Sequence, residues 1–264
     1  MTKFNLLNQK QYKFNDLITV NIPLVGDVWG EDRDIAIERG YLQTASLFIQ
    51  TPTDLMLELK EIGIYWTDVT EYEVFTMFLL SLLSEIQQGK DRDKIIQRWE
   101  LVFPTLDCSD IWAKSNDDNK NVIFVNSKDQ IIFNKAIYEQ LSDLLCCILH
   151  AEKNREYRKV PEKETRDYIL DRAKKKRERE KTRLQNKQDS KSSSALDGVI
   201  LFLVNNCNFK YNFETVKNIT LYDLYASYKQ INKNAEIDNI MSGYYFGTVD
   251  LKKIGDSKLQ RIII

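Results

Sequence analysis

The feature that most constrains this fold is a block of charge at residues 152–191, which can supply little to a hydrophobic core. The block holds sixteen Lys/Arg and nine Asp/Glu, an excess of seven positive charges, whereas the whole chain carries a net charge of −1. The remainder of the chain is therefore acidic, with a net charge of −8. Charge segregated on this scale indicates a segment built to be solvated or to meet a partner, between two regions that must form their own cores.

The apolar patterns on either side of this block predict a mainly α fold, α+β with a small β-hairpin or sheet. We expect a helical domain at residues 1–152 with a hairpin near 122–133, a charged helical connector at 153–194, and a small helical unit at 195–264. A chain of 264 residues can bury one large core or two small ones. Nine glycines and four prolines are few for a sandwich or barrel, which needs many tight turns.

Several local signals place the elements. Thr70 and Glu73 form a capping box before an apolar helix at 74–86, and Asn134 is placed to cap a helix that reaches about residue 152. Residues 51–54 predict a further helix start, followed by a helix at 55–62 that stops at Gly63. A short strand is expected at 18–23, and β-rich runs at 122–125 and 130–133 predict the hairpin. We expect later helices at 164–185, 199–204, 220–233 and 238–242, followed by an aromatic turn at 243–247.

The helix at 164–185 is composed of strong helix formers with few apolar residues, so most of its surface should be exposed. Only a thin apolar seam is available to it, formed by Tyr168, Ile169, Ala173 and Leu184.

The residues give no sign of catalysis, and we expect neither an enzyme nor a cofactor or metal site. His150 is the only histidine, and its place at a helix end predicts a cap or a surface residue. No phosphate-binding glycine motif occurs. The acidic residues Asp27, Glu31, Asp32 and Asp34 lack the spacing of a calcium loop and read as a solvated loop. The four cysteines have no disulfide or metal spacing, so we expect reduced, small core residues.

Hydropathy predicts no membrane partner. The longest apolar stretch, residues 75–86, falls short of the roughly 20 residues that a spanning helix needs. Residues 1–13 also lack the apolar core of a signal peptide, so we expect the protein inside a cell.

Two groups of residues are candidates for partner binding. The first is basic and the second aromatic: Arg172, Lys174, Lys175, Lys176 and Arg177, then Tyr244, Tyr245 and Phe246. The basic group fits a solvated connector, an acidic protein partner or nucleic acid. Nucleic acid is the least favoured of the three, because Glu178 and Glu180 interrupt the basic run and the chain is acidic overall. The aromatic group fits either a partner contact or the closure of the C-terminal core.

Several short motifs in order give the chain a likeness to a known group of proteins. These motifs are IPLVGD at 22–27, TPTDLM at 51–56, GIYWT at 63–67, RDYI at 166–169, NFKYNFE at 208–214, LYDLY at 221–225 and GYYFGTVDL at 243–251. Together they resemble tail assembly chaperone-like proteins encoded in tail gene clusters of phages that infect low-GC Gram-positive bacteria. The likeness spans nearly the whole chain, although the ending Arg261–Ile264 is less aromatic than the group's pattern.

The resemblance implies a non-enzymatic role in phage tail morphogenesis, as a chaperone that holds the tape-measure protein while tail-tube subunits assemble. The expected partners are tape-measure and tail-tube proteins, with self-association left open, and the expected location is the host cytoplasm during assembly or the virion. On this hypothesis the basic helix attracts acidic partner segments, and apolar helices such as 74–86 donate a groove. Two alternatives remain open: a structural component of the tail or baseplate, and a phage protein that binds a host target.

Overall fold

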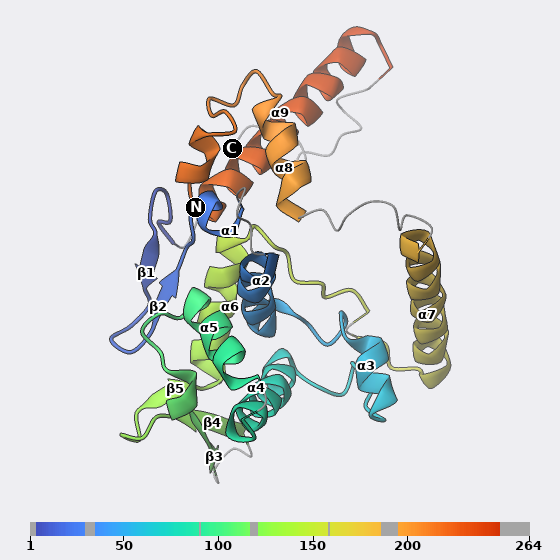
Figure 1. Ribbon diagram of the computed structural model, residues 1–264. Coiled ribbons are helices and arrows are strands. Elements are labelled where there is room, and N and C mark those ends of the chain that lie inside the picture. The colour runs from blue at the N-terminus through green and yellow to red at the C-terminus, as the bar shows by residue number, and fades with distance from the viewer. Residues whose placement is uncertain are drawn as a thin grey trace.

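The protein was analysed as a computed structural model that describes residues 4–29, 35–89, 91–116, 121–157, 159–185 and 195–248. These residues form nine α-helices and five short strands, so the predicted mainly α class with a small β component is confirmed (Figure 1). In chain order the elements are β1 (Gln11–Lys13), β2 (Thr19–Asn21), α1 (Val25–Val28), α2 (Ile35–Ile49), α3 (Met56–Glu61), α4 (Glu71–Gln87), α5 (Arg92–Val102), η1 (Cys108–Asp110), β3 (Trp112–Asn116), β4 (Asn121–Val125), β5 (Ile131–Phe133), α6 (Lys135–Ile148), α7 (Lys163–Gln185), α8 (Ala195–Val204), η2 (Thr215–Asn218) and α9 (Leu221–Tyr245).

The two strongest predicted helix starts are confirmed. The Thr70 hydroxyl accepts the Glu73 N–H at 3.2 Å, and the Glu73 carboxylate accepts the Thr70 N–H at 2.6 Å, which completes the capping box of α4. At α6 the Asn134 side chain accepts the Ile137 N–H at 2.9 Å. Each cap satisfies backbone donors that the first helical turn leaves unpaired.

The helix predicted at 55–62 is confirmed as α3, which begins at Met56 after turns at residues 52–55. At this start the Asp54 carboxylate accepts the Thr51 N–H at 2.9 Å, and the Thr51 hydroxyl accepts the Asp54 N–H at 3.4 Å. The Thr51 hydroxyl also donates to the Asn154 carbonyl at 2.7 Å, and the Thr53 hydroxyl donates to the Glu156 carbonyl at 3.0 Å. These threonines therefore hold the segment that leads from α6 to α7, a tertiary role that the local pattern could not reveal. Gly63 does follow the helix end with φ +81°, as expected of a glycine that stops a helix.

The small sheets agree in part with prediction. β4 and β5 form the expected hairpin, with Phe124 opposite Phe133. A third strand, β3, pairs antiparallel with β4 and was not predicted. Side chains 112–115 of β3 are all exposed, so this edge strand carries no alternation of apolar and polar residues, and its backbone pairing alone defines it. The expected strand at 18–23 is β2, which pairs with β1.

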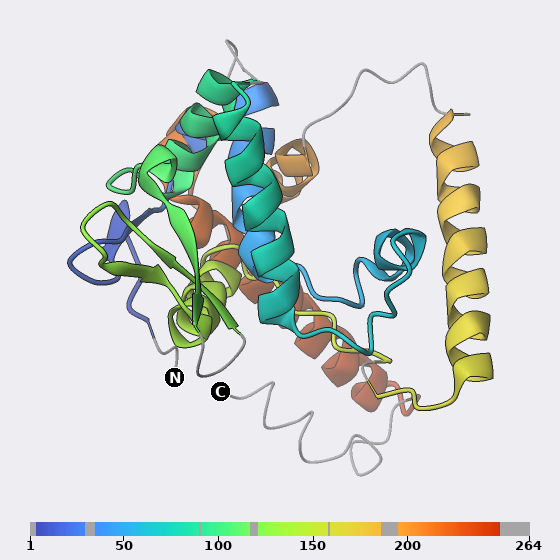
Figure 2. The same cartoon turned by 90° about the horizontal axis from the view of Figure 1, so that it is seen from below.

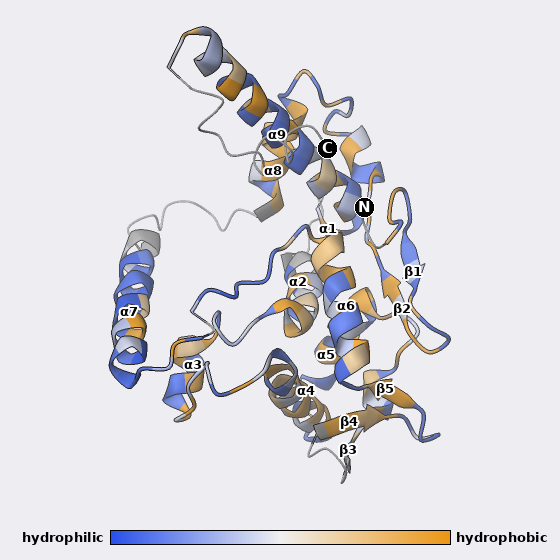
Figure 3. Cartoon of the chain, turned by 180° about the vertical axis from the view of Figure 1, so that it is seen from behind, coloured by the Kyte–Doolittle hydropathy of each residue, from blue (hydrophilic) through white to orange (hydrophobic). Residues whose placement is uncertain are grey.

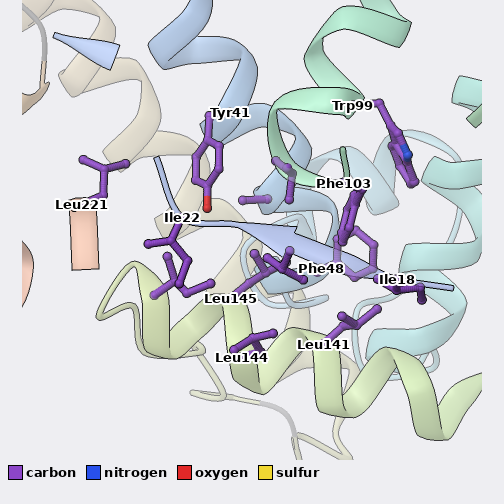
Figure 4. Close-up of a cluster of buried hydrophobic side chains, with 14 of the residues drawn as sticks. Ile18, Ile22, Tyr41, Phe48, Trp99, Phe103, Leu141, Leu144, Leu145 and Leu221 are labelled. Atoms are coloured by element: carbon purple, nitrogen blue, oxygen red, sulfur yellow. The ribbon is translucent and has the colours of Figure 1, made fainter. Parts of the chain in front are cut away.

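The main core forms around α2, which packs on α4, α5 and α6. At its end the Phe48 ring lies 4.8 Å from Phe75 and 5.3 Å from Phe103, measured between ring centroids. Figure 4 shows Phe48 and Phe103 beside the strand that carries Ile18 and Ile22, with the leucines of α6 on the other side. Rings at these separations add specific edge and stacking contacts to the burial of apolar area.

Residues 195–248 share this core. Leu196, Ile200, Leu221 and Leu224 belong to the same buried cluster as the residues around Phe48. The chain after β2 pairs directly with the segment before α9, because the Val25 N–H donates to the Ile219 carbonyl at 2.8 Å and the Leu221 N–H donates to the Pro23 carbonyl at 2.9 Å. The division into segments 1–152, 153–194 and 195–264 remains a prediction about sequence organisation.

The end of the described chain differs from expectation. In place of separate helices at 220–233 and 238–242, α9 runs without a break from Leu221 to Tyr245. The asparagines near residue 233 weaken helix propensity by only fractions of a kcal/mol per residue, about 0.7 at most, which is too little to break a helix already propagating. The stop comes at Gly247, whose φ of +72° suits the end of a helix.

Candidate functional site

The predicted connector helix α7 stands apart from the main body and packs against α3 (Figure 2). Its partly or fully buried residues are spaced as one helix face: Arg166, Ile169, Leu170 and Ala173. Leu170 enters a second apolar cluster that is separate from the main core and contains Leu55, Leu59, Trp66 and Val74. The charged helix is therefore attached to the protein along one narrow stripe.

Polar contacts reinforce this attachment. Two cations lie over the Tyr65 ring: the Lys60 ammonium is 3.9 Å from the ring centroid and the Arg166 guanidinium carbon is 4.6 Å from it. The Tyr65 hydroxyl donates to Asp167 at 3.0 Å. Further along the helix, Arg177 forms an ion pair with Glu58 of α3 at 2.8 Å. Cations over an aromatic face are attracted by the ring quadrupole, so α7 has a defined orientation on α3.

The prediction that α7 has only a thin apolar seam is confirmed for the described side chains, but part of the predicted membership is wrong. Leu170 is buried and Ile169 and Ala173 are half-buried, but Tyr168 is 66% exposed and points away from α3. The predicted seam omits Leu170, although its spacing from Ile169 and Ala173 places it on the same helix face. The side chain of Leu184 lies outside the described residues. Figure 3 shows the result, with hydrophilic colour over most of α7.

The structure divides the five predicted basic residues between two sides of α7. Lys174 and Arg177 line a groove of about 550 Å³ between α3 and α7. Arg172, Lys175 and Lys176 do not line it and are exposed. The groove has Leu57 and Leu170 among its lining residues and otherwise charges of both signs, so it offers a narrow apolar base between charged rims.

The predicted aromatic residues lie on a different surface. Tyr244, Tyr245 and Phe246 end α9 and are exposed, Tyr245 by 77% and Phe246 by 82%. The alternative that they close the C-terminal core is therefore wrong. Figure 1 places this end of α9 away from α7, so the two predicted groups do not form one site.

His150 lies at the end of α6, as expected, but not as a cation. Its ring stacks on Tyr222 with centroids 5.0 Å apart and planes at 27°. Burial, together with the nearby Lys229 charge, lowers the pKa of His150 below its usual value of 6.5. Its Nε2 atom is buried without a hydrogen-bond partner. His150 thus serves as a neutral packing contact between α6 and α9.

An ion-pair cluster holds the segment between α6 and α7. The Glu71 carboxylate contacts Lys153 Nζ at 2.7 Å and Arg155 Nε at 3.1 Å, and the Glu71 and Lys153 side chains are 11% and 9% exposed. Burial raises the pKa of Glu71, but the hydrogen bonds and charges of Lys153 and Arg155 outweigh that effect, so the pKa lies below its usual value. Lys153 and Arg155, two cations of the 152–191 block, therefore attach this segment to α4 through Glu71.

The other candidate chemistries carry no site. Asp27 accepts the Leu24 N–H at 2.9 Å, while Glu31, Asp32 and Asp34 lie outside the described residues. Across the described ranges, no three His, Cys, Asp or Glu side chains group as metal ligands. Burial raises the pKa of the Cys108 thiol to about 12, which suits an unreactive core residue. Cys207, expected in the core, is exposed. No helix in the part of the chain that the structure describes is long and apolar enough to cross a bilayer.

Comparison with known proteins gives one match. Residues 186–258 match the family model described as YomV second domain, which represents a phage-derived family. The match covers less than half of the chain, and includes α8 and α9. No curated protein and no solved structure matches the chain significantly. The match supports a phage origin and a phage-associated domain, and it carries no information about tail chaperones.

Proposed function

We propose that this chain is a non-enzymatic phage morphogenesis protein that holds the tape-measure protein during tail assembly. The observation that carries the proposal is α7, a 23-residue helix attached to the protein by one stripe, whose other described side chains are exposed. The fold does not use this exposed charge in its core. The phage-derived family match and the resemblance to tail assembly chaperone-like proteins give the biological setting.

The exposed basic side chains of α7 can bind acidic segments of such a partner, and the groove between α3 and α7 can bind its apolar side chains. Tape-measure proteins are long and amphipathic, and tend to aggregate before assembly. Exposed cations raise the rate at which acidic segments meet the surface, because their field extends over about a Debye length of 8–10 Å. Once an acidic segment has bound, Leu57 and Leu170 in the groove would cover apolar side chains of the same partner.

Helix α4 contributes less than the resemblance implied. Its apolar face, with Phe75, Leu79 and Leu83, is buried in the main core and is closed to a partner. Only its flank remains, where Phe78 and Leu82 line a hollow of about 230 Å³. The proposal therefore places the partner on α7.

The test is mass spectrometry of purified phage particles beside an affinity capture from infected-cell lysate. We expect capture of the tape-measure or tube protein from lysate, and absence of this chain from particles. Stoichiometric presence in particles would identify a structural tail component instead. Capture of a host protein, with no tail protein, would identify a host-binding role. Binding that does not weaken between 50 and 500 mM salt would remove charge attraction from the proposal.

A further inference from the structure

One side of α7 presents a continuous row of four exposed side chains. The row consists of Tyr168, Arg172, Lys175 and Arg179, spaced at i, i+4, i+7 and i+11. At 3.6 residues per turn these positions lie within about 60° of one another and opposite Leu170, the residue that is buried against α3. All four are exposed, so the row points directly away from the protein.

The carboxylates that interrupt this basic segment in the sequence lie off the row. Glu178 lines the groove on the α3 side. Glu180 is about 100° around the helix from Arg179. Asp171 forms an exposed ion pair with Lys175 at 2.6 Å, an i,i+4 contact of the kind that contributes little and exchanges readily with other partners. Within the described residues, no ion pair holds Arg172 or Arg179.

We propose that this row is the docking surface for an acidic helix, whose Asp or Glu side chains repeat at i, i+4 and i+7, with Tyr168 as the contact for an apolar neighbour. The row spans about three helical turns, or roughly 17 Å, which matches a facing stripe of three or four carboxylates. The inference rests on the proposed function, because it names the chemistry by which the partner is recognised.

The shape of the charge favours a helix over nucleic acid. The row is one side chain wide, with Asp171 and Glu178 on one flank and Glu180 on the other. A phosphate backbone laid along α7 would meet these carboxylates, whereas a narrow acidic stripe would contact only the row. Nucleic-acid surfaces are usually broad basic patches on basic domains, and this chain has a pI of about 6.0.

The experiment measures binding of a fluorescent 20-residue helical peptide, with Glu at i, i+4, i+7 and i+11, to the full chain. A peptide of the same composition with the Glu residues spread around the helix is the ligand control. The test variant is R172Q/K175Q/R179Q. The matched variant K128Q/K163Q/K210Q removes the same charge from exposed positions outside the row and outside the groove. Circular dichroism verifies that both variants keep their helix content.

We expect the row variant to bind the striped peptide about tenfold more weakly, from three exposed ion pairs, and the matched variant to bind within about threefold of the unmodified protein. Tyr168→Ala should weaken binding without changing its salt dependence. Three results would each contradict the row as a docking surface for an acidic helix. These are equal losses of binding in both triple variants, equal binding of the two peptides, and tighter binding of a 20-base DNA than of the striped peptide at 150 mM salt.

The outcome separates the row from the proposed function. Peptide binding through the row, with no tail protein captured from lysate, would leave the acidic-helix surface standing and remove the tape-measure role. If the R172Q/K175Q/R179Q variant captured the tape-measure protein as well as the unmodified protein does, the tape-measure role would stand. The row would then not be the surface that recognises this partner.

Discussion

The Arg166 guanidinium lies 4.6 Å from the centre of the Tyr65 ring, so the first turn of α7 is joined to the loop that follows α3. The same guanidinium donates to Asp68 at 3.2 Å and to the Thr67 hydroxyl at 3.0 Å. This contact lies at the start of the attachment stripe, and Leu170 follows it one turn later. An otherwise solvated helix is thereby held at a fixed angle, with one row of charge turned outward.

Leu170→Ala should loosen α7 without unfolding the main core, because Leu170 belongs to the separate second cluster. Truncating a buried leucine typically costs about 2–5 kcal/mol, and the low end is expected at this edge position. Hydrogen exchange should accelerate in residues 163–177 and remain unchanged in α2 and α6. Tyr168→Ala, on the exposed side, is the control and should leave protection unaltered. Uniformly faster exchange across the chain would show that the two clusters unfold as one.

Glu71→Gln should destabilise the protein by about 2–4 kcal/mol, because it leaves the buried Lys153 ammonium without its carboxylate. Lys153→Met in the same background should recover part of the loss, since it removes the uncompensated charge. Urea denaturation of the two single variants and the double variant measures both effects. Strictly additive losses would contradict a direct interaction between the two side chains.

Acid should also weaken this cluster. The pKa of Glu71 is lowered in the folded protein, so its stabilisation is complete above the unfolded value near 4.5 and is lost as the pH falls through the lower folded value. The Glu71→Gln variant should lack this part of the acid dependence. Denaturation midpoints measured from pH 5.5 downward provide the comparison.

Gly40→Ala should destabilise the protein even though alanine favours helices. An added Cβ at Gly40 would lie 2.8 Å from Arg98 Cγ and 3.3 Å from Leu101 Cδ1, where α2 crosses α5. Overpacking typically costs about 1–3 kcal/mol and exceeds the helix-propensity gain of about 1 kcal/mol. Gly198→Ala in α8 is the matched control, because no atom lies within 4 Å of its added Cβ, and it should stabilise. Thermal melts that rise for both variants would disprove a tight crossing.

His150 should make stability fall in mild acid. Its pKa is lowered in the folded protein, so between that value and 6.5 the unfolded chain binds more protons, and stability decreases as the pH falls through this window. His150→Gln should remove the dependence. Denaturant unfolding of both proteins at pH 7.5, 6.5 and 5.5 tests this, and the difference between them isolates the histidine from the carboxylates. Parallel curves would contradict a pKa lowered by burial and by the nearby Lys229 charge.

The sequence predicts a structural element correctly where residues close together in the chain determine that element. The Thr70–Glu73 capping box and the Asn134 cap depend on groups three residues apart, and the 122–133 hairpin pairs residues less than a dozen positions apart, so the sequence contains their cause. Longer-range effects were not visible in it. Thr51, for example, is used by a segment about a hundred residues away. β3 pairs with the neighbouring β4, but its sequence lacks the alternation that would predict a strand.

Composition identifies the candidate basic residues of α7, but it does not show which side of the helix each residue occupies. Taken as one basic run, Arg172, Lys175 and Lys176 could not be separated from Lys174 and Arg177 until the burial of Leu170 fixed the rotation of the helix. The aromatic residues at the end of α9 were also identified, while the alternative that they fill a core was wrong.

The sequence by itself determined that this protein is mainly helical, where its capped helices begin, and that one long helix is too charged to be buried. These properties follow from side-chain chemistry acting within a few residues. Only the tertiary structure decided that residues 195–248 share the main core, that His150 is neutral against Tyr222, and which side of α7 faces outward. Each of these depends on which surfaces meet across distant parts of the chain, because burial and charge pairing are set by packing partners rather than by neighbours in sequence.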